Sequence, residues 1–329
     1  MLARMKLSQV SDHCFAAINE RNRLCDSNSG LINLGGRVVI DTQCDLGHAR
    51  RMIELFGTVA PAMPERVVIT HEDPDHVWGN QLFPDAQIIA QRKIVERLPH
   101  TSNPHDLQYM QRAARNRLLR IVLRVTNPGV LALADQLAED YNFDGIELVL
   151  PDTVFEDRYE LNLDGTQVNL LHVGPGHQWG DTMIHLPAEG VLFSGDVLFR
   201  QCTPMAWAGS YADWQRSLER VLELKPAVIV PGHGPICGIE GVHELQAYLH
   251  YVHAEARQCF ERGLTEMEAA QRIDLGPYAE WKAPARIYFN VARAYREFRG
   301  EANDAPWEIP KVFAGMYKLA KARGLDVAF

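Results

Sequence analysis

The sequence lacks the long apolar segment that a membrane-spanning protein needs. Among its 329 residues, no apolar run approaches the roughly 20 residues that cross a bilayer as a helix. Residues 1–7 carry a little positive charge but no apolar stretch of the kind found in signal peptides. We therefore expect a cytoplasmic protein with no membrane partner.

Basic charge and paired cysteines are also scarce. The formal net charge is −9, and an acidic surface argues against a nucleic-acid partner, whose phosphates are bound by basic patches. Six cysteines are scattered without a Cys-x-x-Cys pair, which is typical of reduced intracellular proteins rather than disulfide frameworks. With 47% hydrophobic and 23% charged residues, the composition is that of an ordinary globular enzyme with ample core.

What the chain does have is a cluster of metal-capable side chains directly after an apolar run. Residues 66–69 read as a buried strand, and His71, Asp73, Asp75 and His76 follow closely. Side chains repeat every two residues on extended chain, so His71 and Asp73 are expected to point the same way. A proline then lets the chain turn, so Asp75 and His76 are expected to point in a different direction from His71 and Asp73. The pattern suits two adjacent metals, although a solvated acidic loop contains the same residue types.

Three later strand ends carry further ligand types. His177 follows a Gly-Pro-Gly sequence, Asp196 follows an apolar run and a glycine, and His233 lies in Pro-Gly-His-Gly. Glycines at these places let the backbone come close to the site. Four strand ends in succession therefore deliver imidazole and carboxylate groups.

This ordered set resembles the metallo-β-lactamase-fold hydrolase superfamily, whose pattern is His-x-His-x-Asp-His, then a lone His, an Asp and a final His. The resemblance covers roughly residues 8–240 and implies an α/β fold, an αββα sandwich with a helical insertion and a helical C-terminal extension. We expect the hydrolase domain over residues 1–245, its helical insertion at about 91–146, and the extension over 246–329.

The resemblance also implies seven metal ligands, divided between a first site, a second site and a bridge: His71, Asp73 and His177; Asp75, His76 and His233; and Asp196.

Asp73 stands where the family usually has a histidine. With it, three carboxylates and a hydroxide neutralise two divalent ions, whereas a histidine would leave one positive charge. The extra carboxylate is expected to make the site a weaker and slightly harder Lewis acid. Imidazole and carboxylate ligands suit one or two zinc ions, and manganese, iron or a single occupied site are alternatives.

The expected chemistry needs few further groups. A metal-bound water loses a proton near neutral pH and becomes a hydroxide nucleophile. We predict Asp75 and His172 as catalytic residues, because His172 lies shortly before His177 on what reads as the same strand.

Large apolar side chains cluster on the motif loops: Trp78, Trp179, Met205 and Trp207. They indicate an apolar or aromatic substrate pocket. The alternative is that they only pack the loops together.

Helical segments bear on the site as well. Residues 105–125 have apolar residues at helical spacing with arginines between them, and a second helix is predicted for 130–139. Because this insertion separates two metal motifs, it forms either a lid or wall of the active site or a lateral helix pair. The C-terminal helices, predicted at 285–298 and 312–323, either cover the site or form a dimer interface.

The leading function is that of a metal-dependent hydrolase acting on an ester, lactone, thioester or amide bond of a small, partly apolar molecule. The resemblance also admits hydrolytic dehalogenation of an activated aromatic, or an iron-dependent redox enzyme of the same fold. The rival outside catalysis is a metal-stabilised binding protein. The expected partners are a small-molecule substrate and a second copy of the chain in a homodimer.

Overall fold

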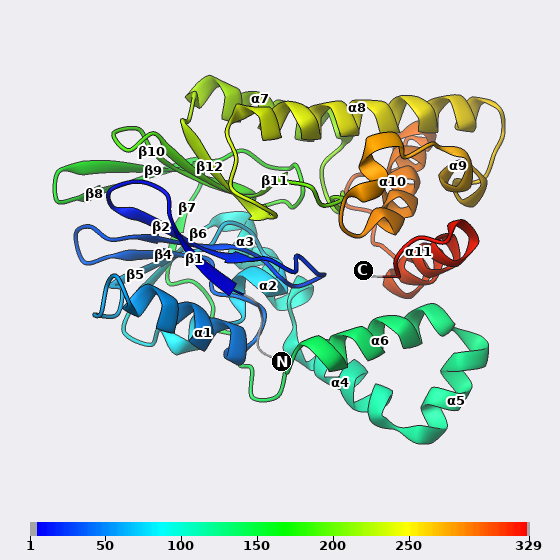
Figure 1. Ribbon diagram of the computed structural model, residues 1–329, viewed down its shortest axis with the longest axis horizontal. Coiled ribbons are helices and arrows are strands. Elements are labelled where there is room, and N and C mark those ends of the chain that lie inside the picture. The colour runs from blue at the N-terminus through cyan, green and yellow to red at the C-terminus, as the bar shows by residue number, and fades with distance from the viewer. Residues whose placement is uncertain (1–4, 328–329) are drawn as a thin grey trace.

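The fold is known from a computed structural model that describes residues 5–327. Two β-sheets pack face to face between layers of helices, which confirms the predicted αββα sandwich (Figure 1). Of residues 1–7, for which no signal peptide is expected, residues 1–4 lie outside the described part of the chain.

The larger sheet follows chain order and is built from strands rich in β-branched residues. Its strands pair antiparallel from β1 to β4 and parallel from β4 to β7. They are β1 (Met5–Gln9), β2 (Cys14–Asn19), β3 (Ser29–Ile32), β4 (Val38–Ile40), β5 (Arg66–Val68), β6 (Gln87–Gln91) and β7 (Thr153–Phe155).

The smaller sheet has the order β12-β11-β10-β9-β8. It is antiparallel from β8 to β11, whereas β11 and β12 run parallel, so these two strands lead toward the same edge. Its strands are β8 (Arg158–Leu163), β9 (Thr166–His172), β10 (Thr182–Leu186), β11 (Val191–Phe199) and β12 (Val228–His233).

The central core lies between the two sheets. Ile32 and Val68 from the larger sheet and Ile184 and Phe193 from the smaller one are all buried in it. Helices cover the outer faces: α1 packs on β1 and β2, and α7 and α8 pack on β11. Their bounds, with those of the short helices after β5, are α1 (Leu46–Gly57), α2 (Pro74–Val77), η1 (Asn80–Leu82), α7 (Tyr211–Leu224) and α8 (Ile239–Glu261).

The predicted helical insertion is present, with one correction. It contains α3 (Arg92–Thr101), α4 (Pro104–Arg115), α5 (Arg117–Thr126) and α6 (Pro128–Asp140). The single helix predicted for 105–125 is two helices, because Asn116 has extended backbone (φ −77°, ψ 113°). Its side chain accepts hydrogen bonds from the first backbone N–H groups of α5, which starts a new helix there.

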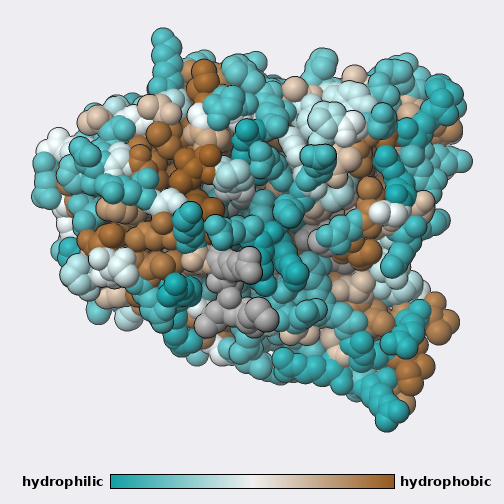
Figure 2. Space-filling model, in the orientation of Figure 1, coloured by the Kyte–Doolittle hydropathy of each residue, from teal (hydrophilic) through white to brown (hydrophobic). Residues whose placement is uncertain are grey.

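Helix α5 leaves its apolar face in solvent. Leu118, Ile121, Val122 and Val125 are 76%, 58%, 53% and 82% exposed, although they have the spacing of a packed helical stripe. Figure 2 shows apolar side chains gathered at the outer tip of the arm that α4, α5 and α6 form.

The C-terminal extension returns to this insertion. Helix α11 packs against α6, so the two helical parts of the chain are joined away from the sheets (Figure 1). The extension contains α9 (Glu266–Arg272), η2 (Gly276–Glu280), η3 (Pro284–Arg286), α10 (Ile287–Arg299) and α11 (Ile309–Arg323). The domain boundary expected at residue 245 falls inside α8 and stays a prediction. None of the helices in residues 5–327 combines the length and apolar composition that crossing a membrane requires.

Candidate metal centre

The loop between β5 and α2 carries the first ligand-type side chains. Asp73 still has extended backbone (φ −76°, ψ 148°), as the spacing of His71 and Asp73 predicts. Pro74 then begins α2, because its fixed φ suits the first helical position. Asp75 and His76 therefore lie on a helical turn, and the four side chains divide into two pairs.

His71, Asp73 and His177 form the first group of ligand-type atoms. Nε2 of His177 lies 2.9 Å from Oδ2 of Asp73, and Nε2 of His71 lies 3.7 Å from the same oxygen. Both histidines are buried and Asp73 is half-buried. One atom from each residue lies within 4.8 Å of the other two, which is close enough to share a metal ion.

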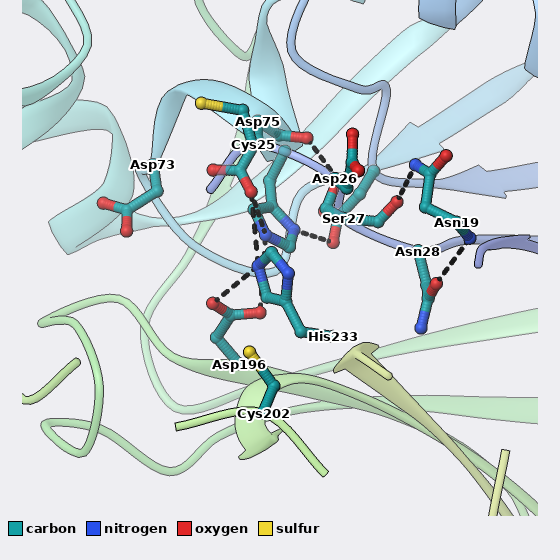
Figure 3. A network of polar contacts seen from close by, with 12 residues as sticks. Asn19, Cys25, Asp26, Ser27, Asn28, Asp73, Asp75, Asp196, Cys202 and His233 are labelled. Carbon is teal, nitrogen blue, oxygen red and sulfur yellow. Dashed lines mark hydrogen bonds and ion pairs between the residues drawn. The ribbon is translucent and has the colours of Figure 1, made fainter. Parts of the chain in front are cut away.

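Asp75, His76 and His233 form the second group, and Asp196 lies between the groups. Oδ2 of Asp75 is 3.2 Å from Nε2 of His233 and 3.6 Å from Nε2 of His76. Oδ2 of Asp196 is 3.3 Å from Nε2 of His177 and 3.4 Å from Nε2 of His233. Figure 3 shows Asp75, Asp196 and His233 turned toward one another. The structure thus brings all seven predicted ligands into one cluster, divided as the resemblance implies.

Two glycines allow the strands to approach this closely. Gly195 has φ +50°, and a Cβ there would lie 2.6 Å from Cβ of Thr70. A Cβ on Gly232 would overlap Oδ1 of Asp196. Any larger residue at position 232 would therefore displace a carboxylate of the cluster.

The cluster contains buried polar atoms that the chain itself does not satisfy. Nε2 of His71, Nε2 of His76, Oδ2 of Asp75 and Oδ1 of Asp196 are buried without a hydrogen-bond partner. Unpaired buried polar atoms are rare, and a group of them facing one another is typical of an ion-binding site. Imidazole nitrogen with carboxylate oxygen is a donor set that suits a divalent transition metal.

Other side chains orient these histidines. Nδ1 of His76 lies 2.7 Å from Oδ2 of Asp41, and Oγ1 of Thr70 donates to the same oxygen at 2.7 Å. Oγ1 of Thr70 is also 3.0 Å from Nδ1 of His71. Such contacts hold a metal-binding imidazole in one orientation. Asp41 was not among the predicted site residues, although its place at the end of β4, next to β5, is a usable signal.

His177 and Asp73 of the first group are also held by neighbouring groups. Nδ1 of His177 lies 2.7 Å from the carbonyl oxygen of Met205. Nε2 of Gln178 donates to Oδ1 of Asp73 at 2.6 Å, which leaves Oδ2 to face His177. Gln178 was also missed from the sequence, because nothing in its local pattern separates it from an ordinary loop glutamine.

The carboxylates make the cluster a strongly negative environment. Burial lowers the pKa of His76, but the surrounding aspartates, with Asp196 first, outweigh burial and raise this pKa to about 9. Burial raises the pKa of Asp73, but hydrogen bonds from two histidines, His177 first, bring it below its usual range. Asp73 therefore stays ionised at neutral pH, which favours cation binding.

A cavity of about 720 Å³ opens over the cluster. Five cluster residues line it: Asp73, Asp75, His177, Asp196 and His233. All four large side chains predicted for a pocket line it as well: Trp78, Trp179, Met205 and Trp207. The predicted apolar pocket beside the ligands is therefore confirmed.

Both helical parts of the chain supply walls of this cavity. Leu107 of α4 and Leu137 of α6 line it from the insertion, and Ile309 and Phe313 line it from α11. Of the alternatives for the insertion, a wall of the site is the one that the structure shows.

His172 lies apart from the cluster. β9 ends at His172, so His177 is in the following loop and the expectation that one strand carries both was wrong. Nε2 of His172 lies 3.1 Å from the carbonyl oxygen of Trp179, and His172 is not among the residues that line the cavity. A catalytic role for His172 stays a prediction.

The chain is similar in sequence to known hydrolases. A linear primary-alkylsulfatase from Pseudomonas sp. is 23% identical over 278 residues, which are 78% of this chain and 52% of the relative. An acyl-coenzyme A thioesterase of Bos taurus is 26% identical over 222 residues, which are 63% of this chain and 72% of the relative. The chain thus spans about half the length of the alkylsulfatase that it matches.

A solved structure shows the same fold. The stereoselective inverting sec-alkylsulfatase from Pseudomonas sp. superposes with a TM-score of 0.65 at 18% identity, over 93% of this chain and 52% of that one. The family model of the metallo-beta-lactamase superfamily matches residues 22–233, the span that contains all seven clustered residues. The chain therefore belongs to the metallo-beta-lactamase superfamily.

Proposed function

We propose that this chain is a metal-dependent hydrolase of a small, partly apolar molecule. The observation that carries the proposal is the position of seven buried or half-buried ligand-type side chains against a cavity with an apolar wall. A bound metal there faces a space large enough for a small substrate.

The seven residues would hold one or two metal ions, with zinc first and manganese or iron as alternatives. His71, Asp73 and His177 would hold one ion, Asp75, His76 and His233 the other, and Asp196 would contact both. When bound, such ions polarise the bond to be cleaved and lower the pKa of a water.

Asp75 is the residue best placed to handle the proton. Its Oδ2 is buried without a hydrogen-bond donor, and Asp75 lines the cavity. That oxygen can orient an attacking water and accept its proton. Asp41 holds His76, whose Nε2 lies 3.6 Å from that oxygen.

The apolar wall sets the kind of substrate. Tryptophan, methionine and leucine side chains surround the cavity, so an alkyl or aryl part of the substrate would lie there. An ester, lactone, thioester or amide bond would then lie over the cluster. The thioesterase and alkylsulfatase relatives add support for the thioester and for a sulfate ester. A homodimer and a cytoplasmic location stay predictions.

Metal analysis followed by a substrate panel tests the proposal. The purified protein, reconstituted with zinc, manganese or iron, is assayed on esters, lactones, thioesters, amides, alkyl sulfates, β-lactams and an activated aryl halide. Hydrolysis that is lost in His76→Ala supports the proposal. Metal binding without turnover across the panel would contradict it and favour a binding protein. An iron requirement together with oxygen consumption would favour the redox enzyme.

A further inference from the structure

Arg286 is a buried cation in the wall of the cavity. It is the last residue of η3, only 3% of it is exposed, and it lines the same cavity as the ligand cluster. Burial raises the pKa of the Cys25 thiol, Asp75 raises it further, and the charge of Arg286 opposes this rise. The charges of Arg286 and Asp75 therefore both act on Cys25, and all three residues line the same cavity.

Its hydrogen bonds leave part of the guanidinium without a partner. Nη1 donates to the carbonyl oxygen of Thr203 at 3.0 Å and contacts Sγ of Cys202 at 3.4 Å. Nε is buried and donates to nothing. No carboxylate within residues 5–327 forms an ion pair with Arg286.

Other arginines of the same region do have counter-charges. Arg97, which also lines the cavity, pairs with Glu72 at 3.4 Å and lies over the ring of Trp179. Arg293, which is 1% exposed, pairs with Glu297 at 3.2 Å. A guanidinium stays charged at physiological pH, and a buried charge without a partner is costly. An anion that enters with the substrate would supply that partner.

We propose that Arg286 binds an anionic oxygen group of the substrate, a carboxylate or a sulfate. The inference rests on the proposed function and names its substrate class, an anionic ester with an apolar chain. The apolar chain lies against the cavity wall, and the anionic oxygens accept hydrogen bonds from the free side of the guanidinium. Arg286 lines the same cavity as the ligand cluster and adds to its wall a positive charge that no carboxylate of residues 5–327 pairs with.

The kinetic test compares metal-loaded wild-type protein with Arg286→Gln on substrates that differ in charge. An aryl half-ester of adipic acid carries a free carboxylate, its methyl-capped counterpart is neutral, and octyl sulfate represents the sulfate source. We expect Arg286→Gln to lose about 30-fold or more of the kcat/KM preference for an anionic substrate, mainly through KM, because losing one partner of a buried charge pair weakens binding that much. Loss on the half-ester alone identifies the carboxylate, and loss on octyl sulfate alone identifies the sulfate. Unchanged values on both overturn the proposal.

Two variants separate recognition from folding. Arg293→Gln removes another buried arginine, outside the cavity lining, and is expected to keep the preference; an equal loss there would make the effect structural and end the proposal. Arg286→Lys keeps the charge without the two-pronged contact and is expected to retain an intermediate preference. It replaces Arg286→Gln if that variant does not fold, and an unchanged preference then counts against the proposal.

Calorimetry with octanoate and octyl sulfate, with octanol as the neutral control, separates this inference from the proposed function. Suppose the wild type hydrolyses nothing but binds an anion about 30-fold more tightly than Arg286→Gln does. The anion site then stands and the hydrolase proposal fails. If the wild type hydrolyses esters while Arg286→Gln binds both anions as tightly, the hydrolase proposal stands and the anion site fails.

Discussion

The two sides of the cavity are built from different parts of the chain and have opposite character. The sandwich side carries aspartates and histidines from the segments after β5 and β9, from within β11 and from the end of β12. Hydrogen bonds hold several of these side chains in place. The helical side carries Leu107, Leu137 and Phe313 from α4, α6 and α11, and it is held by apolar packing. The ligand cluster and the helical part of the apolar wall therefore lie on separate structural elements, so substitutions on the two sides should have separable effects.

The largest loss of activity is expected on the sandwich side, for the variant His76→Ala. His76 contacts Asp75, Asp196 and Asp41, so its loss opens the second group of ligands and leaves three carboxylates without it. We expect kcat to fall by about 10³-fold or more, because a metal contributes several kcal/mol to catalysis and each 1.36 kcal/mol is tenfold. Metal content by elemental analysis should fall with it. Full metal content together with wild-type kcat would remove His76 from the ligand set.

Replacing Asp73 tests the departure from the family pattern. Asp73→His makes the ligand set less negative, which lowers the pKa of a metal-bound water, so the pH–rate profile should move to lower pH with metal binding retained. Asp73→Ala should weaken the first group selectively, by about 10- to 100-fold in metal affinity. The readouts are a metal titration and the pH–rate profile. A bystander Asp73 would leave both unchanged, and the remaining ligands would then describe a one-metal site.

On the helical side, Leu137→Ala should affect stability rather than metal content. Leu137 is 1% exposed, and truncating a buried leucine costs about 2–4 kcal/mol. The matched control is Ile121→Ala on α5, which is 58% exposed and should change the free energy of unfolding by less than about 0.5 kcal/mol. Urea unfolding measures both. A large loss in Ile121→Ala would mean that α5 is covered in solution.

The smallest effect, a modest loss of stability, is expected at Asp45, which links α1 to the chain after α6. Asp45 caps α1 by accepting a hydrogen bond from the backbone N–H of His48 at 2.7 Å, and it accepts another from the backbone N–H of Asn142, shortly after α6, at 2.9 Å. Asp45→Ala should lower the free energy of unfolding by about 1–2 kcal/mol at neutral pH. Asp45→Asn keeps a capping oxygen, so its free energy of unfolding should fall by less than that of Asp45→Ala.

The pH dependence of that loss has a definite sign. Burial raises the pKa of Asp45, but its hydrogen bonds and charge interaction with His48 outweigh burial and hold the pKa below its ordinary value. A carboxyl with a lowered folded pKa stabilises the fold above its unfolded pKa of about 4, and this contribution disappears as the pH falls through the folded pKa. The gap between wild type and Asp45→Ala in urea unfolding should therefore narrow below about pH 4. If the difference in free energy of unfolding between the two proteins stays constant below that pH, capping alone, without the charge of Asp45, accounts for the difference.

Local sequence was enough to predict the ligands but not their surroundings. His71, Asp73, Asp75 and His76 lie within one short segment, so alternation on extended chain and a proline turn predict how they divide. Asp41 and Arg286 reach the site from other segments, and Gln178 directly follows His177. Of these three residues, only Asp41 has a signal in the sequence, because it lies at the end of β4. The same limit explains His172, which is near His177 in sequence but turns to the Trp179 carbonyl because β9 ends before the loop.

In the insertion, helical periodicity likewise did not predict which apolar faces are buried. α5 and α6 both have apolar residues at helical spacing, but α6 buries Leu133 and Leu137 whereas α5 buries none of its residues. Periodicity predicts that a face is apolar, and only a neighbouring element decides whether that face is covered. For α6 the neighbour is α11, which lies far away in sequence.

From the sequence we could predict the family and the helices between and after the metal motifs, because strand ends and ligand spacing are local properties of the chain. The resemblance to the family then implied the αββα sandwich and the seven candidate ligands. Only the folded structure shows that α4, α6 and α11 wall the cavity, that α5 exposes its apolar face, and that Arg286 lines the cavity without an ion-pair partner among residues 5–327. Those features depend on contacts between distant segments, whose burial and charge arise only when the chain has folded.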